Sequence, residues 1–339
     1  MKKITALLLA LMMLAGVLAG CGKPQDTGKA GKLKVVTTIF PAYDWVRAIL
    51  GDKADNAEVT MLLDNGVDLH SYQPTADDIV KISDCDLFVC VGGESDGWVE
   101  NALKNAANRN MKVINLLEVL GDSVKTEETV EGMQEDDHDH GHSHDEYDEE
   151  HDEAEGHDHG EEMDEHVWLS LKNAQVLCVT LADALCAIDP DNKNTYIANA
   201  AAYRDKLAAL DADYKAAVDG ATHKTVLFGD RFPFRYLVDD YGLRYYAAFA
   251  GCSAETEASF ETVSFLAKKV DELGLPCVLT IEGAQHRIAE TIVQNTAGKN
   301  QKVLTMDSMQ STTSKDVANG ATCLSVMEKN LSVLKGALG

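Results

Sequence analysis

The sequence predicts an α/β protein with two lobes, each built on a mostly parallel sheet, and a long helical region that joins them. Two stretches of the chain alternate short β-branched apolar runs with amphipathic helical patterns, and the residues between them are almost continuously helical in pattern. The 339 residues, 45% of them hydrophobic, suffice for one large or two medium domains with buried cores. A ligand is expected in the cleft between the lobes, at the carboxyl ends of the strands.

The first alternating stretch predicts four strands connected by helices. Pro41 fits the first turn of a helix that Gly51 ends, and Thr75 with Asp78 fits a capping box for the next helix. The expected strands are Leu33–Phe40, Glu58–Leu63, Leu87–Val91 and Met111–Leu117, and the expected helices are 41–50, 75–83 and 95–109. This βαβαβαβ order is typical of a parallel sheet covered by helices.

The middle of the chain predicts helices, and the C-terminal part repeats the α/β pattern. The expected middle helices are Leu171–Ile188 and Asn194–Asp219, separated by a break at Pro190. The second of them rises about 1.5 Å per residue and can therefore span a domain. The expected C-terminal strands are Lys224–Phe228, Arg244–Phe249, Pro276–Ile281 and Gln301–Met306, with helices over Pro233–Tyr241, Phe260–Leu273, Arg287–Thr296 and Ala321–Leu338.

The N-terminus predicts export and a lipid anchor. Lys2 and Lys3 precede a short apolar run, which ends in Leu-Ala-Gly before Cys21. This ending resembles the bacterial lipobox, which implies cleavage and lipidation of Cys21. The expected organisation is a signal peptide over 1–20, a lipidated tether over 21–31, an N-terminal lobe over 32–170, a helical region over 171–219 and a C-terminal lobe over 220–339.

The other seven cysteines mostly lie within apolar runs, and none forms a CxxC pair. We expect them to be chiefly small buried hydrophobic residues. Because their number is odd, they cannot all pair within one chain. One disulfide, between Cys252 and another C-terminal cysteine, is left as an open alternative.

The acidity of the chain is concentrated in one segment inside the N-terminal lobe. Residues 126–165 hold 20 of the 56 Asp and Glu residues and no Lys or Arg, against a net charge of −26. A chain without a basic face is a poor partner for nucleic acid. The segment also carries seven histidines, which are His138, His140, His142, His144, His151, His157 and His159. We expect a disordered loop, either merely solvated or also an auxiliary low-affinity collector of metal.

Four further side chains lie near strand ends where the cleft is expected. His70 follows the second strand, His166 lies where the acidic segment rejoins the fold, and Asp230 and His286 follow two C-terminal strands. Two imidazoles from one lobe, with a carboxylate and an imidazole from the other, would form a four-ligand metal site. Such donors suit Zn²⁺ well and Mn²⁺ acceptably. Glu282 is the alternative to His286 as the fourth ligand.

These residues lie in motifs that resemble the zinc and manganese substrate-binding lipoproteins of ABC transporters. Gly66–Thr75 is similar to the first histidine motif of that family, and Val35–Pro41 to its opening strand. Asp164–Leu169 matches its Asp-Pro-His-hydrophobic-Trp-Leu motif, with Glu165 where proline is usual. The turn that holds the third ligand departs from the pattern and is one residue longer here, with Asp230 as the best match. The resemblance implies two α/β lobes joined by a long rigid helix, with the metal between them.

The resemblance implies a binding protein rather than an enzyme. The expected function is capture of Zn²⁺ outside the cytoplasm by a monomer, anchored to the bacterial membrane through Cys21, and delivery to an ABC permease and its ATPase. The alternatives are a Mn²⁺-specific protein of the same family, and a surface metal buffer or adhesin. A zinc hydrolase is the remote alternative, since the sequence lacks an HExxH motif.

Overall fold

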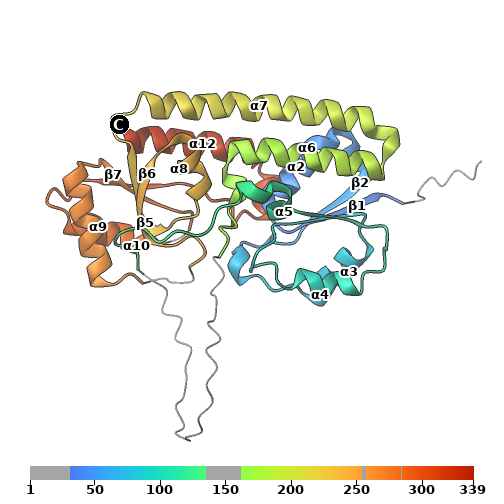
Figure 1. The fold of residues 1–339 in the computed structure, drawn as a ribbon, viewed down its shortest axis with the longest axis horizontal. Helices are drawn as coiled ribbons and strands as arrows, with labels where there is room; N and C mark the ends of the chain where they lie inside the picture. The colour runs from blue at the N-terminus through green and yellow to red at the C-terminus, as the bar shows by residue number, and fades with distance from the viewer. Residues whose placement is uncertain (1–30, 135–161, 254–256, 284) are drawn as a thin grey trace, which may run out of the picture. The chain divides into compact units, whose positions relative to one another are not determined.

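The computed structural model describes residues 31–134, 162–253, 257–283 and 285–339. Within it, Leu33–Gly339 is one compact unit (Figure 1). The predictions for the signal peptide, for Cys21 and for the seven histidines between His138 and His159 lie outside the described residues. The predicted domain boundaries stay predictions, whereas the fold class is confirmed: two parallel-sheet α/β lobes with a long helix.

The N-terminal lobe contains a four-stranded parallel sheet with the order β2-β1-β3-β4. Its strands are β1 (Leu33–Thr37), β2 (Ala57–Met61), β3 (Leu87–Cys90) and β4 (Lys112–Asn115). Its helices are α2 (Phe40–Leu50), α3 (Ala76–Asp84), α4 (Val99–Lys104) and α5 (Leu116–Leu120), with short 3-10 turns at η1 (Gly51–Asn56), η2 (Leu69–Ser71) and η3 (Gly121–Ser123).

The helix starts and ends expected from the sequence are present in this lobe. Pro41 lies in the first turn of α2, and Gly51 ends that helix with a positive φ of 56°. Thr75 and Asp78 form the capping box at the start of α3. The predicted helix 95–109 is shorter in the structure and reduces to α4. The chain makes turns instead over residues 94–98, where the Asp96 carboxylate accepts a hydrogen bond from the Gly92 N–H at 2.9 Å.

The helical middle consists of η4 (Val167–Leu169), α6 (Leu171–Ile188), η5 (Pro190–Asn192) and α7 (Lys193–Asp219). Figure 1 shows α7 beside α6 and α12, and α7 contacts both helices as well as α2. The 27 residues of α7 rise about 1.5 Å each, so this helix reaches elements of both lobes. By length and composition α6 could cross a bilayer, but its Leu177, Leu181 and Leu185 are buried, as in the core helix of a globular fold.

The C-terminal lobe repeats the plan of the first. Its parallel sheet has the order β6-β5-β7-β8, which is the same crossover pattern. The strands are β5 (Thr225–Arg231), β6 (Arg244–Phe249), β7 (Cys277–Thr280) and β8 (Lys302–Thr305). The helices are α8 (Arg235–Tyr241), α9 (Phe260–Leu273), α10 (Arg287–Asn295), α11 (Ser314–Ala318) and α12 (Cys323–Leu338). In each sheet the order of the strands reverses between its first and third strands, β1 and β3 or β5 and β7, and ligands of open α/β sheets bind at such a point.

The two lobes are joined by an apolar core and by specific hydrogen bonds. One continuous cluster of buried side chains includes residues from both sheets and from α6, α7 and α12. The Trp168 indole donates to the Ser308 carbonyl at 2.9 Å, and the Tyr236 hydroxyl donates to the Asp164 carbonyl at 2.7 Å. The Arg231 guanidinium lies 2.8 Å from Asp68. Loops at the carboxyl ends of both sheets are therefore held against one another.

The buried carboxyl of Asp96 makes the stability of the fold depend on pH. Burial, together with the nearby Glu165, raises the pKa of Asp96 to about 6, although the Gly92 amide opposes the shift. The unfolded chain has an ordinary aspartate pKa of about 3.9. The folded state therefore binds this proton more tightly, and the group costs stability as pH rises from about 4 to about 6.

We expect Asp96→Asn to gain stability relative to wild type as pH rises. Between pH 4 and pH 7 the difference in free energy of unfolding should grow by about 2–3 kcal/mol in favour of the variant. Urea unfolding at both pH values measures it, with Asp205→Asn on the exposed face of α7 as the control. If the free energies of unfolding of the variant and of wild type differed equally at both pH values, the raised pKa of Asp96 would be contradicted.

Candidate metal centre

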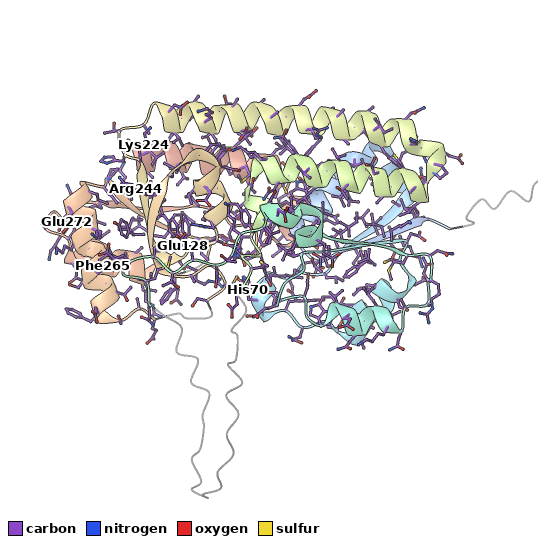
Figure 2. All side chains as sticks on the ribbon, in the orientation of Figure 1. His70, Glu128, Lys224, Arg244, Phe265 and Glu272 are labelled. Carbon is purple, nitrogen blue, oxygen red and sulfur yellow. The ribbon has the colours of Figure 1, made fainter. Side chains whose placement is uncertain are left out.

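His70 lies in η2, and the chain around it fixes its backbone. Asp68 caps this turn and accepts a hydrogen bond from the His70 N–H at 3.0 Å. The Nδ1 atom of His70 lies 2.8 Å from the Ser95 hydroxyl and 3.5 Å from the Glu165 carboxylate. Figure 2 shows His70 where loops from both sheets converge. The ring is therefore oriented by oxygen atoms on its Nδ1 side, and its Nε2 faces His166.

His166 is fully buried directly before η4. Its Nδ1 lies 3.0 Å from Oδ1 of Asp164, which also accepts from the His166 backbone N–H at 2.9 Å. Because an ionised carboxylate only accepts hydrogen bonds, we assign the Nδ1 proton of His166 to this contact. The ring therefore presents the lone pair of its Nε2 on the opposite side, in the arrangement usual for metal-binding histidines.

The Nε2 atoms of His70 and His166 face each other at 3.3 Å. The rings meet edge to face, with centroids 5.2 Å apart. When both Nδ1 atoms carry the protons, two lone pairs point at the same place and repel. Two imidazoles on one tetrahedral Zn²⁺, with Zn–N bonds of about 2.0–2.1 Å, have nitrogens about 3.3–3.4 Å apart. The pair thus has the spacing that a shared metal ion requires.

The pKa values of the two imidazoles are shifted in opposite directions. Burial, and then the neighbouring His166, lower the pKa of His70 to about 3. Burial also opposes a charge on His166, but the carboxylates of Asp164, Glu165 and Asp68 together raise the pKa of His166 above its usual value. The pair therefore holds at most one proton over most of the pH range. A proton on Nε2 of His166 lies in the position that a metal ion would occupy, so protons and metal compete there.

Glu165, which replaces the usual proline, has a structural role beside this pair. Its Oε1 accepts from the Ser95 N–H at 2.9 Å, and that contact places the Ser95 hydroxyl against His70. The carboxylate is 2% exposed, and its Oε2 has no hydrogen-bond partner among the described residues. Gly93, with a positive φ of 78°, lies so close to Glu165 that a Cβ there would collide with it. The loop after β3 therefore depends on a glycine at this position.

Asp230, His286 and Glu282 lie on the C-terminal lobe around a cavity of about 420 Å³. Asp230 accepts from the backbone N–H groups of Arg231 and Ile281, and burial raises the pKa of Asp230. The Glu282 carboxylate is already engaged by donors from residues 308–311. The cavity is lined by these three side chains but not by His70 or His166. The predicted four-ligand set is therefore only half assembled in the structure, and that set stays a prediction.

Arg231 connects the cavity to the histidine pair. Its guanidinium bonds Asp68, which caps the turn of His70, and it also donates to the Ser253 carbonyl at 3.3 Å. Burial alone would raise the pKa of Asp68, but Arg231 and His70 together hold that pKa below the usual value. Arg231, the last residue of β5, therefore makes an ion pair between the lobes.

Cys252 is the residue that sequence reasoning did not place in the site. The metal-binding atoms of His70, His166 and Cys252 all lie within 4.8 Å of one another, the one such cluster found among the described residues. Burial, and then Glu127, Asp164 and Glu165, raise the pKa of the Cys252 thiol. The seven described cysteines are all free, so the disulfide left open for Cys252 is not formed among them. The available signal was the position of Cys252 just after a strand that ends at the cleft.

The matching family model is described as "Zinc-uptake complex component A periplasmic" and covers residues 35–337. The zinc-binding lipoprotein AdcA of Streptococcus pneumoniae serotype 4 is 34% identical over 338 residues, which are 99% of this chain and 61% of AdcA. The chain thus spans about three-fifths of the length of that relative. The high-affinity zinc uptake system protein ZnuA of Bacillus subtilis is 30% identical, over 95% of this chain and 94% of ZnuA.

Solved structures agree with the sequence comparisons. The Zn(II)-bound ZnuA-like domain of S. pneumoniae AdcA is 30% identical, with a TM-score of 0.67 over 91% of this chain and 99% of that domain. The metal-dependent lipoprotein YcdH of B. subtilis is 27% identical, with a TM-score of 0.69 over the same share of this chain and 99% of YcdH. Fold, paired histidines and sequence agree: the chain belongs to the family of periplasmic zinc-uptake component A proteins.

Proposed function

We propose that this protein captures Zn²⁺ between its lobes, outside the cytoplasm, and delivers it to the permease and ATPase of an ABC importer. A lipid anchor at Cys21 would hold it at the bacterial membrane. The relatives named for zinc binding and zinc uptake support this proposal. One observation carries it: a buried and a partly buried imidazole, each oriented through Nδ1, present Nε2 atoms 3.3 Å apart.

The donor chemistry favours Zn²⁺ over Mn²⁺. Imidazole suits zinc, whereas Mn²⁺ prefers carboxylate, carbonyl and water oxygens in octahedral geometry. The imidazoles are held by Asp164, Ser95 and Glu165 in the way that outer partners orient zinc ligands. In this proposal His70 and His166 supply two ligands, and the C-terminal lobe supplies the remainder, for which Asp230 and His286 are the sequence-based candidates.

Binding and transport account for this geometry better than hydrolysis does. A zinc hydrolase needs a general base within hydrogen-bond reach of a metal-bound water. The carboxylate of Glu282, the alternative fourth ligand, accepts bonds from Ser308, Gln310 and Ser311 and lines the separate cavity, so it is not placed to act as that base. We therefore propose a carrier that holds its ion without transforming a substrate.

We expect His70→Ala and His166→Ala each to weaken Zn²⁺ binding by more than the roughly 10–100-fold that loss of an outer partner costs. Each variant removes one of the two oriented nitrogens. Competition titration against a chelator of known affinity measures the change. His223→Ala, at the opposite end of β5 from Asp230, is the matched control and should bind as wild type does. Tight binding that survives either site substitution would overturn the proposal.

Asp164→Asn should lower Zn²⁺ affinity by about 10–100-fold, although it removes no ligand. An amide can present an N–H to Nδ1 of His166, and the ring proton then moves to Nε2 and blocks coordination. The same titration measures the effect, and Asp205→Asn is the control. Wild-type affinity in Asp164→Asn would show that this contact does not orient the ring.

Removal of the His-rich segment should leave the tight site intact. The described residues on either side of the segment pair with each other: Thr126 bridges to Met163, and the Asp164 N–H donates to the Lys125 carbonyl at 2.8 Å. Asp164 and Glu165 contact the histidine pair and Glu127 accepts from the Cys252 N–H, so the deletion must spare all three. We propose replacing residues 135–161 with a flexible Gly/Ser linker.

This deletion should retain one tightly bound Zn²⁺ and lose the additional weakly bound ions that wild type takes up. Equilibrium dialysis with metal analysis counts both classes. Loss of the tight ion would assign capture to the deleted segment and contradict the proposal.

A further inference from the structure

Cys252 differs from the other cysteines of the described chain. It lies in the loop after β6 and is partly exposed, whereas the other six are buried. Those six are Cys85, Cys90, Cys178, Cys186, Cys277 and Cys323. Cys252 therefore has a position from which its sulfur can meet a ligand that enters from solvent.

The distances around Cys252 fit a shared metal ion. Its sulfur and the metal-binding nitrogens of His70 and His166 lie within 4.8 Å of one another. On a tetrahedral Zn²⁺ with a Zn–S bond of about 2.3 Å, sulfur and nitrogen are about 3.6 Å apart. A side-chain adjustment of about 1 Å or less therefore completes a three-ligand set.

Three contacts hold this loop against the histidine pair. Gly251 packs on His166 so closely that a Cβ on the glycine would lie 3.0 Å from Cε1 of the ring. The backbone N–H of Cys252 donates to Glu127 at 2.7 Å, and Arg231 donates to the carbonyl of Ser253 at 3.3 Å. Residues from both lobes thus fix the position of Cys252.

The loop that contacts the backbone of Cys252 belongs to the N-terminal lobe. Lys125, Glu127 and Glu128 precede the first of the seven histidines, and they contact Tyr236, Cys252 and Arg235 of the C-terminal lobe. Figure 2 labels Glu128 over the C-terminal lobe. The N-terminal lobe therefore extends across the cleft and supports the Cys252 loop directly.

We propose that the Cys252 thiolate is the third ligand of the captured metal, supplied by the C-terminal lobe beside the two imidazoles. This inference rests on the proposed function and names the residue that closes its site. The thiol gives its proton to solvent as the metal–sulfur bond forms. The buried carboxylates of Asp164 and Glu165, with the thiolate, offset the charge of the divalent ion in a poorly solvated place.

A sulfur ligand sharpens the choice of metal. A set of two nitrogens and one sulfur favours Zn²⁺, and the softer Cd²⁺, over Mn²⁺. In the same assignment, Cys252 takes the third position in place of Asp230, while Asp230, His286 and Glu282 line the neighbouring cavity. Their substitution should therefore affect affinity less than substitution of Cys252.

Cobalt spectroscopy and zinc titration on the full mature chain test this assignment. One equivalent of Co²⁺ should give a near-ultraviolet sulfur-to-metal charge-transfer band in wild type, and Cys252→Ser should lose the band. The His-rich segment has no cysteine, so it cannot produce this signal. Cys252→Ser should also weaken Zn²⁺ binding at least about tenfold. Cys186→Ser, at the end of α6, is the matched control and should keep both properties.

Alkylation of wild type tests the same claim without a variant, which covers the case of a misfolded substitution. Zn²⁺ should protect Cys252 from iodoacetamide, as mass spectrometry of the peptide measures. Tight Zn²⁺ binding with no sulfur band, wild-type affinity in Cys252→Ser, or equal alkylation with and without Zn²⁺ would overturn the inference and leave the proposed function standing. Failure of wild type to bind Zn²⁺ tightly would instead overturn the proposed function.

Discussion

Two imidazole nitrogens, on His70 and His166, approach to 3.3 Å, and each ring is fixed by oxygen atoms on its other nitrogen. Neutral rings in these orientations repel through their lone pairs, and a proton or a metal ion between them removes the repulsion. Burial, and then this approach to His166, lower the pKa of His70, whereas the carboxylates of Asp164 and Glu165 raise the pKa of His166. Metal must therefore displace a proton from His166 once pH falls below the pKa of that group, and binding should weaken with acidity.

The fold positions the two histidines for that contact. The parallel sheets bring the loops after β2 and β3 to one edge, which places His70 beside Ser95. The second lobe meets the first through the Arg231–Asp68 ion pair and through Trp168, two residues after His166. Because α7 contacts elements of both lobes, the lobes have one continuous buried core rather than a flexible linker between them.

The sequence was sufficient for the fold because the relevant signals are local. Alternating strands and helices, the cap at Thr75 and the break at Pro190 all act within a few residues. It was also sufficient to select His70 and His166 from eleven histidines, because both lie in recognisable motifs. The C-terminal donors were harder to predict, since Cys252 approaches the pair only through Gly251 packing on His166 and through Glu127, 125 residues away in the chain. Such a contact depends on how two lobes pack, and no local pattern reports it.

X-ray absorption at the zinc edge, on protein loaded with one equivalent of Zn²⁺ and with residues 135–161 replaced by a linker, tests the central claim most directly. The paired-imidazole account predicts a four-coordinate ion with two imidazole nitrogens at about 2.0–2.1 Å, and the assignment of Cys252 adds one sulfur at about 2.3 Å. An ion surrounded by six oxygen ligands, or one with no imidazole scattering, would contradict the account.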